Sequence, residues 1–116
     1  MSKIELQPGE VELGKWTLNL CPHGGGRYTG PLTVTNQRVL FLSKFDTSLS
    51  GAIAELIVYK GDYGFISIPK DQIQKVDVVG GFLKKKVAIT MTNGAVHTLD
   101  YGLLSVEKIA EAIRQR

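Results

Sequence analysis

The sequence lacks the features of secreted and membrane-spanning proteins. A single cysteine, Cys21, excludes an internal disulfide, which fits a reducing, intracellular setting. No stretch approaches the roughly 20 apolar residues that a membrane-spanning helix needs. The first residues interleave Lys3, Glu5 and Gln7 with apolar ones, so the apolar centre of a secretory signal is missing. We therefore expect a cytoplasmic protein, with any membrane contact peripheral.

The sequence also lacks a large excess of either positive or negative charge. The sequence has 14 Lys and Arg against 11 Asp and Glu, a formal net charge of +3. So mild an excess permits an anionic partner without demanding one. Nucleic-acid-binding domains usually carry a denser basic stripe, so we expect no nucleic-acid partner. The one dense basic cluster is Lys84-Lys85-Lys86.

Residues that carry catalysis or hold metals are sparse. Cys21, His23 and His97 are too few for a metal site, which normally needs three or four ligands with supporting groups. No serine lies in a nucleophile turn, and no pair of carboxylates is distinguished from the scattered acids. Cys21 would need a base to act as a nucleophile, and nothing in the sequence places His97 beside it. We expect no enzyme activity, no cofactor and no metal.

Short alternating stretches separated by turn residues dominate the chain. Its 116 residues suit one domain, 1–116, large enough to bury a core. Thirteen glycines punctuate it, as in a mainly β fold. Residues 48–64 are the least regular: 52–59 could form a helix turn or a strand, and we favour a strand over 56–59 because Ile, Val and Tyr favour strands. The other expected strands, about seven in all, cover 10–20, 30–35, 38–42, 65–68, 73–79, 87–92 and 96–101.

Two hairpins can be placed by register. A two-residue Asn36-Gln37 loop would pair Val34 with Val39 and Leu32 with Phe41, apolar to apolar on one face.

Asn93-Gly94 marks the second hairpin. A two-residue loop would pair Met91 with Val96. We prefer a three-residue loop, Asn93 to Ala95, because it pairs Ile89 with Leu99 and Val87 with Tyr101; it also sets His97 opposite Met91.

The chain ends in a predicted amphipathic helix. Ser105 is a suitable N-cap and Glu107 suits the first turn. Apolar residues at helical spacing form one stripe, which should lie on the sheet. They are Val106, Ile109, Ala110 and Ile113.

Residues 30–41 resemble the strand–Thr-Asn-x-Arg–strand hairpin of GRAM domains, a branch of the pleckstrin-homology-like superfold. Ile68-Pro69 with Ile73 and Val76 resembles that family's following element. The resemblance runs from about Pro8 to Ile113. It implies a mainly β, pleckstrin-homology-like split barrel, in which two nearly orthogonal antiparallel sheets are capped by a C-terminal helix. The signature positions, which describe fold rather than ligand, are Gly30, Leu32, Thr35, Asn36, Arg38 and Phe41.

The resemblance also implies weak, charge-driven binding to anionic lipid. Lys15 and Arg27 fill two basic positions of the loop where relatives hold phosphoinositide, but Thr29 stands where a last Arg is expected. That departure argues against tight phosphoinositide binding. Phe82-Leu83 beside the lysine cluster forms an apolar pair that could enter a membrane interface. The candidate lipid contacts are therefore Lys15, Arg27, Phe82, Leu83, Lys84, Lys85 and Lys86.

Other interpretations stay open. The lysines could simply solvate a loop or protect a strand edge. A protein–protein interaction module is the alternative function: residues 53–59 are apolar, and as an edge strand they could bind a peptide or a second copy of the chain.

Overall fold

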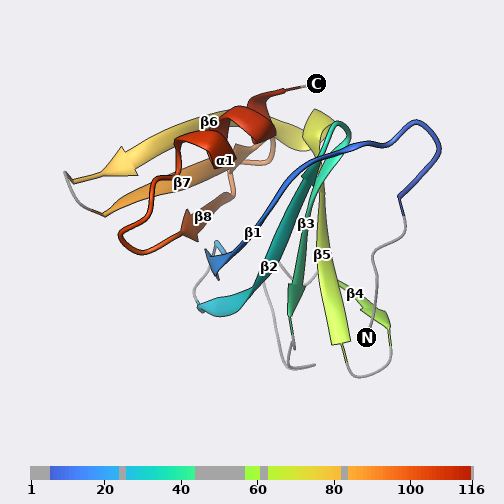
Figure 1. Cartoon of the computed structure of the whole chain (residues 1–116), viewed down its shortest axis with the longest axis horizontal. Coiled ribbons are helices and arrows are strands. Elements are labelled where there is room, and N and C mark those ends of the chain that lie inside the picture. Colours follow the sequence, from blue (N-terminus) through green and yellow to red (C-terminus); the bar gives the residue numbers. More distant parts are fainter. Residues whose placement is uncertain (1–5, 24–25, 44–56, 61–62, 82–83, 116) are drawn as a thin grey trace.

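The structure is a computed structural model that describes residues 6–23, 26–43, 57–60, 63–81 and 84–115 (Figure 1). It confirms a mainly β fold with one C-terminal helix. The elements are β1 (Glu12–Cys21), β2 (Tyr28–Thr35), β3 (Arg38–Ser43), β4 (Ile57–Lys60), β5 (Tyr63–Pro69), a 3-10 turn (Lys70–Gln72), β6 (Ile73–Gly80), β7 (Lys85–Met91), β8 (Val96–Asp100) and α1 (Glu107–Arg114).

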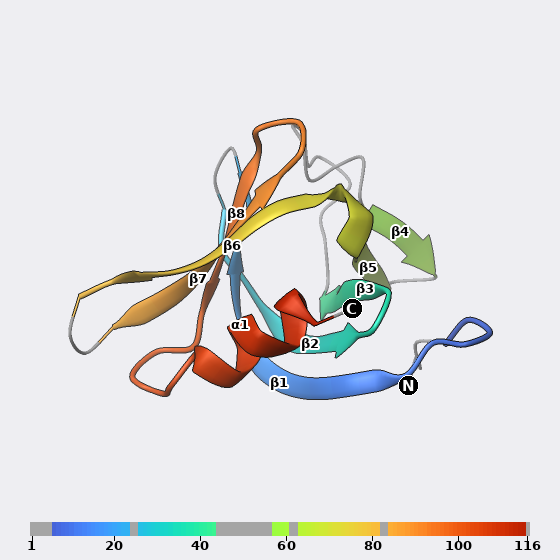
Figure 2. The same ribbon diagram turned by 90° about the horizontal axis from the view of Figure 1, so that it is seen from above.

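All eight strands belong to one open antiparallel sheet, in the order β4-β5-β3-β2-β1-β8-β7-β6. This differs from the two separate sheets that we expected. The link is β1, which pairs with β2 over most of its length and with β8 through its last three residues, Asn19–Cys21. A register shift between Glu12 and Gly14 marks a bulge near its start. Hydrogen bonding therefore runs without a break between the two halves, and the sheet bends around α1 (Figure 2).

The helix supplies one wall of the core. The predicted stripe is confirmed, because Val106, Ile109, Ala110 and Ile113 are all buried in the main apolar cluster. The predicted N-cap is wrong: Val106 occupies that position, and no side chain caps the helix. Since Val106 is fully buried, apolar packing rather than the Ser105 hydroxyl sets the start of the helix.

The first predicted hairpin register is confirmed. Leu32 pairs with Phe41 and Val34 with Val39, and all four side chains are buried in the core.

Both registers considered for the second hairpin are wrong. Val87 pairs with Leu99 and Ile89 with His97, so His97 does not lie opposite Met91. The loop has three residues but begins at Thr92, because the Met91 N–H donates to the Ala95 carbonyl.

Close packing of backbones explains one signature glycine. A Cβ atom at Gly30 would lie 2.0 Å from the Leu42 carbonyl oxygen, a distance that no side chain tolerates. Gly30 therefore allows β2 to approach β3.

The irregular region ends in a strand, as predicted. β4 lies at one edge of the sheet and pairs with β5, while residues 48–56 of that region lie outside the described chain. Within the described residues, no helix is long and apolar enough to cross a membrane.

Candidate functional site

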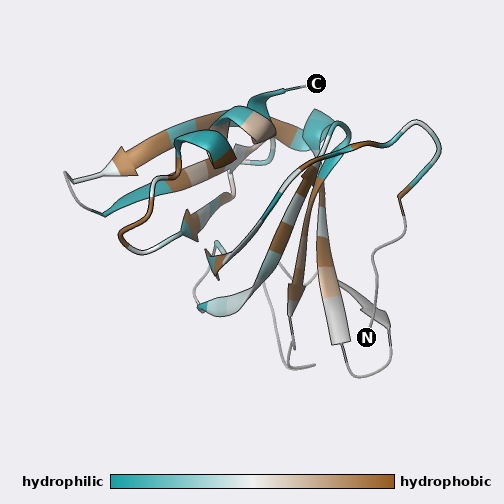
Figure 3. Cartoon of the chain, viewed as in Figure 1, coloured by the Kyte–Doolittle hydropathy of each residue, from teal (hydrophilic) through white to brown (hydrophobic). Residues whose placement is uncertain are grey.

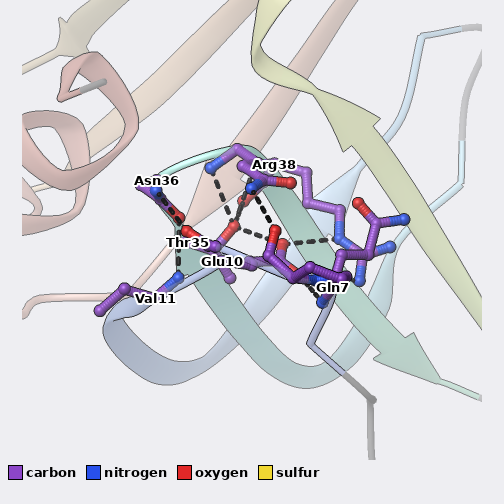
Figure 4. Close-up of polar contacts among 9 residues, drawn as sticks. Gln7, Glu10, Val11, Thr35, Asn36 and Arg38 are labelled. Atoms are coloured by element: carbon purple, nitrogen blue, oxygen red, sulfur yellow. Dashed lines mark hydrogen bonds and ion pairs between the residues drawn. The ribbon is translucent and has the colours of Figure 1, made fainter.

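The signature hairpin is held by the buried carboxylate of Glu10, and we call its hydrogen-bond network the lock (Figure 4). Arg38 donates two hydrogen bonds to Glu10, from Nε to Oε2 at 2.7 Å and from Nη2 to Oε1 at 3.0 Å. The Thr35 hydroxyl donates to Oε2 at 2.6 Å, and the Gln7 N–H donates to Oε1 at 2.8 Å. Asn36 completes the lock, since its Oδ1 accepts the Val11 N–H at 2.8 Å.

These bonds fix Glu10 in its charged form. Its side chain is 0% exposed, and the hydrogen bond from Arg38 is the main reason that its pKa falls to about 2. A carboxyl group with so low a pKa is charged at neutral pH. The network therefore ties the β2–β3 hairpin to the segment that precedes β1.

An open polar hollow of about 460 Å³ lies beside the lock. Its two cationic residues already have partners: Arg38 bonds Glu10, and Lys70 Nζ donates to the Ala112 carbonyl at 2.9 Å and to the Gln115 carbonyl. Lys70 thus caps the end of α1, where cations are favoured. The hollow is lined by Gln7, Asn36, Gln37, Arg38, Ser67, Pro69, Lys70 and Asp71.

The predicted basic cluster lies at the other end of the molecule, where β7 begins. Lys84 and Lys85 are exposed and Lys86 is half-buried. Lys85 Nζ lies 3.4 Å from Glu107 Oε1, both side chains being about half exposed. This contact brings the start of α1 beside Lys85; Lys108, the next residue of the helix, is exposed.

Arg27 approaches the same end through Asp100. Its Nη1 lies 3.0 Å from Asp100 Oδ2, and Asp100 is the strand partner of Lys86. The pKa of Asp100 lies below its ordinary value, first because the Gly102 N–H donates to it and then because Arg27 does. Arg27 is therefore tied to a protein carboxylate while about half of its side chain remains exposed.

Of the other predicted contacts, Lys15 does not join this group. Lys15 is exposed on β1 opposite Thr33. It lies four residues before Asn19, the β1 partner of Asp100, hence roughly 13 Å along the strand. Phe82 and Leu83 lie outside the described residues.

Sequence reasoning missed two exposed leucines beside the lysines. Leu103 and Leu104 are 72% and 59% exposed, in the loop between β8 and α1. Figure 3 shows this hydrophobic loop next to the hydrophilic start of β7. No local pattern in the sequence around these leucines distinguishes exposed from buried positions, so only the folded chain shows their exposure.

Sequence reasoning also missed a contact between the two histidines. The His23 N–H donates to His97 Nδ1 at 3.1 Å, and the Val96 N–H donates to His23 Nδ1 at 3.2 Å. Because Nδ1 of neutral His97 accepts, its proton lies on Nε2, a buried atom with no partner among the described residues. Burial, and secondarily His23, lowers the pKa of His97. The two hydrogen bonds of this pair hold the β1–β2 loop against β8.

Cys21 and His97 lie on opposite faces of the sheet. Cys21 pairs with Thr98, so by strand alternation its side chain faces away from His97. In the described part of the chain, no three His, Cys, Asp or Glu residues are grouped so that they could hold a metal ion.

No family model and no curated protein matches this chain. Its structure is similar to the crystal structure of the C-terminal domain of an unknown protein from Leishmania infantum, with a TM-score of 0.62 and 16% identity. The match covers 93% of this chain and 85% of the Leishmania chain. At this identity the likeness shows a shared fold alone.

Proposed function

We propose that this chain is a non-enzymatic, cytoplasmic module of the GRAM type that attaches peripherally to anionic membranes. The bent sheet around a C-terminal helix and the Glu10–Thr35–Arg38 lock support a pleckstrin-homology-like fold with a GRAM-like hairpin. The observation that carries the function is the gathering of cations at one end of the molecule. Lys84, Lys85 and Lys86 follow one another where β7 begins, and Lys85 contacts Glu107 at the start of α1.

The strength of such binding follows from the charges. Each lysine near an anionic membrane contributes about 1 kcal/mol, so three lysines contribute about 3 kcal/mol. Salt screens this attraction, because the Debye length falls from about 10 Å at 0.1 M to about 3 Å at 1 M. The module therefore binds weakly and depends on ionic strength.

Vesicle sedimentation tests the proposal. The wild type should pellet with vesicles containing phosphatidylserine at 0.1 M salt, but not at 1 M salt or with neutral vesicles. Changing Lys84, Lys85 and Lys86 together to Glu should abolish pelleting. The single change Lys84→Glu should weaken it at least about fivefold. Lys75→Glu is the matched control, because Lys75 is exposed on β6 beside Asp77 and should bind as the wild type does. Failure of the wild type to bind under every condition would refute the proposal.

A protein-interaction module is the second candidate, and the position of β4 favours it. This strand lies at the edge of the sheet, where an added strand could pair. The opposite edge strand, β6, is less open, since Arg114 donates to the Val76 carbonyl at 2.7 Å. Binding of a peptide or second copy along β4 should resist 1 M salt, which separates it from binding to lipid.

A further inference from the structure

The exposed leucines are held by a tight turn. The Leu104 N–H donates to the Tyr101 carbonyl at 3.2 Å, which closes the turn. The Gly102 N–H donates to Asp100 Oδ1 at 2.9 Å, and Gly102 adopts a φ of +65°, a conformation that glycine favours. Leu103 and Leu104 therefore face solvent from a loop that is already ordered.

Side chains of the site hold this turn in place. Asp100 is 8% exposed; its Oδ1 accepts from the turn and its Oδ2 pairs with Arg27. Lys86 is the neighbour of Asp100 across the strands. Arg27 thus acts as a positioning residue: it holds the Asp100 carboxylate, and that carboxylate accepts the hydrogen bond that holds the turn.

The surroundings of the leucines specify the chemistry of a partner. Arg27, Lys84, Lys85 and Lys86 supply four cations, whereas Asp100 and Glu107 supply two carboxylates, both already paired with cations. Two adjacent exposed leucines with an excess of basic groups match a bilayer interface, where apolar side chains enter between headgroups while cations contact anionic lipid. A purely apolar protein groove would match the leucines but leave this excess charge without a counterpart.

We infer that the Leu103–Leu104 turn inserts into the interface of an anionic bilayer while the adjacent lysines bind its headgroups. This inference rests on the proposed membrane function and names the element that enters the membrane. Charge brings the module to the surface, and insertion of the leucines lengthens its stay. Since the turn is closed before binding, little ordering entropy opposes insertion.

The test compares two double variants on vesicles containing phosphatidylserine at 0.1 M salt. Leu103→Ser with Leu104→Ser should lower the partition coefficient at least tenfold, because burying one leucine is worth about that factor. Leu6→Ser with Val11→Ser is the matched control, since those residues are 46% and 58% exposed and precede β1, where Val11 bonds Asn36 of the β2–β3 turn; it should bind as the wild type does. Thermal melts of both variants check that changes at these exposed positions leave the fold intact.

A fluorescence measurement tests insertion directly. When vesicles are added, the emission of Leu103→Trp should shift further to the blue than that of the wild type, which carries only Trp16.

The outcomes separate the two claims. Salt-sensitive binding of the wild type with no loss in the double-leucine variant would overturn the insertion and leave the membrane function standing. No binding by the wild type would overturn both. If ultracentrifugation shows a dimer that the double-leucine change dissociates, while vesicle binding is unchanged, the leucines serve a second copy and the inference is wrong.

Discussion

Changing Glu10 to Gln should destabilise the protein through a single carboxylate. The variant keeps the shape of the side chain but removes the charge that Arg38 grips with two hydrogen bonds. The pKa of Glu10 falls from 4.5 to about 2, and at about 1.36 kcal/mol per unit this amounts to about 3 kcal/mol. Because the amide oxygen of the variant can still accept a hydrogen bond from Thr35 or from the Gln7 N–H, we expect a loss of about 2–3 kcal/mol at pH 7.

The pH dependence identifies the cause. A carboxyl group with a lowered folded-state pKa stabilises the protein above the unfolded value of 4.5, and this contribution is lost as the pH falls toward about 2. The difference in unfolding free energy between wild type and Glu10→Gln should therefore shrink over that range. Urea titrations at pH 7, 4 and 3 measure it, with exposed Glu12→Gln as the matched control. A difference that stays constant with pH, or a loss at pH 7 no larger than that of Glu12→Gln, would refute the reasoning.

Two further predictions concern stability. Gly30→Ala should lower the free energy of unfolding by about 2–3 kcal/mol, because its Cβ would overlap the Leu42 carbonyl oxygen. Gly81→Ala is the control and should be close to neutral in the same urea titrations, since no atom lies within 4 Å of the added carbon. Equal effects of the two changes would contradict this account. Acidification should destabilise the protein through His97, whose lowered pKa means that the unfolded chain gains the proton first. Full stability should hold above the unfolded pKa of 6.5 and decline as the pH falls below it. Melting temperatures at pH 7.5 and 5.5 should differ less in His97→Gln than in the wild type or in His23→Gln, and an unchanged difference in His97→Gln would rule His97 out.

The sequence predicts the local elements well because their signals are local. The register of β2 and β3 follows from apolar pairing across the Asn36-Gln37 turn, and the helical stripe follows from spacing alone. The second hairpin was misplaced because Gly94 takes the left-handed third position of the loop, with a φ of +91°, as three-residue hairpin loops require. If Asn93-Gly94 is taken as the beginning of the loop, every residue of β7 is paired with the wrong residue of β8.

Contacts between distant segments are harder to predict. His23 and His97 lie 74 residues apart, and Arg27 and Asp100 lie 73 apart, so no local pattern connects them. The continuity of the sheet depends on three residues of β1, which resemble the rest of that strand. The lysines are visible as a run of charge, but the leucines that join them are exposed only because of how the chain turns after β8.

The short pairing of β1 with β8 also has a consequence for folding. The pairing between β1 and β2 and those within β6–β8 join segments close in sequence and can form early, whereas Asn19–Cys21 must find a strand roughly 80 residues away. The helix that covers this junction contacts both β1 and β6 and follows the last strand. We therefore expect the two halves of the sheet to form separately. The pairing of β1 with β8 and the packing of α1 against both halves should come late and set the rate of folding.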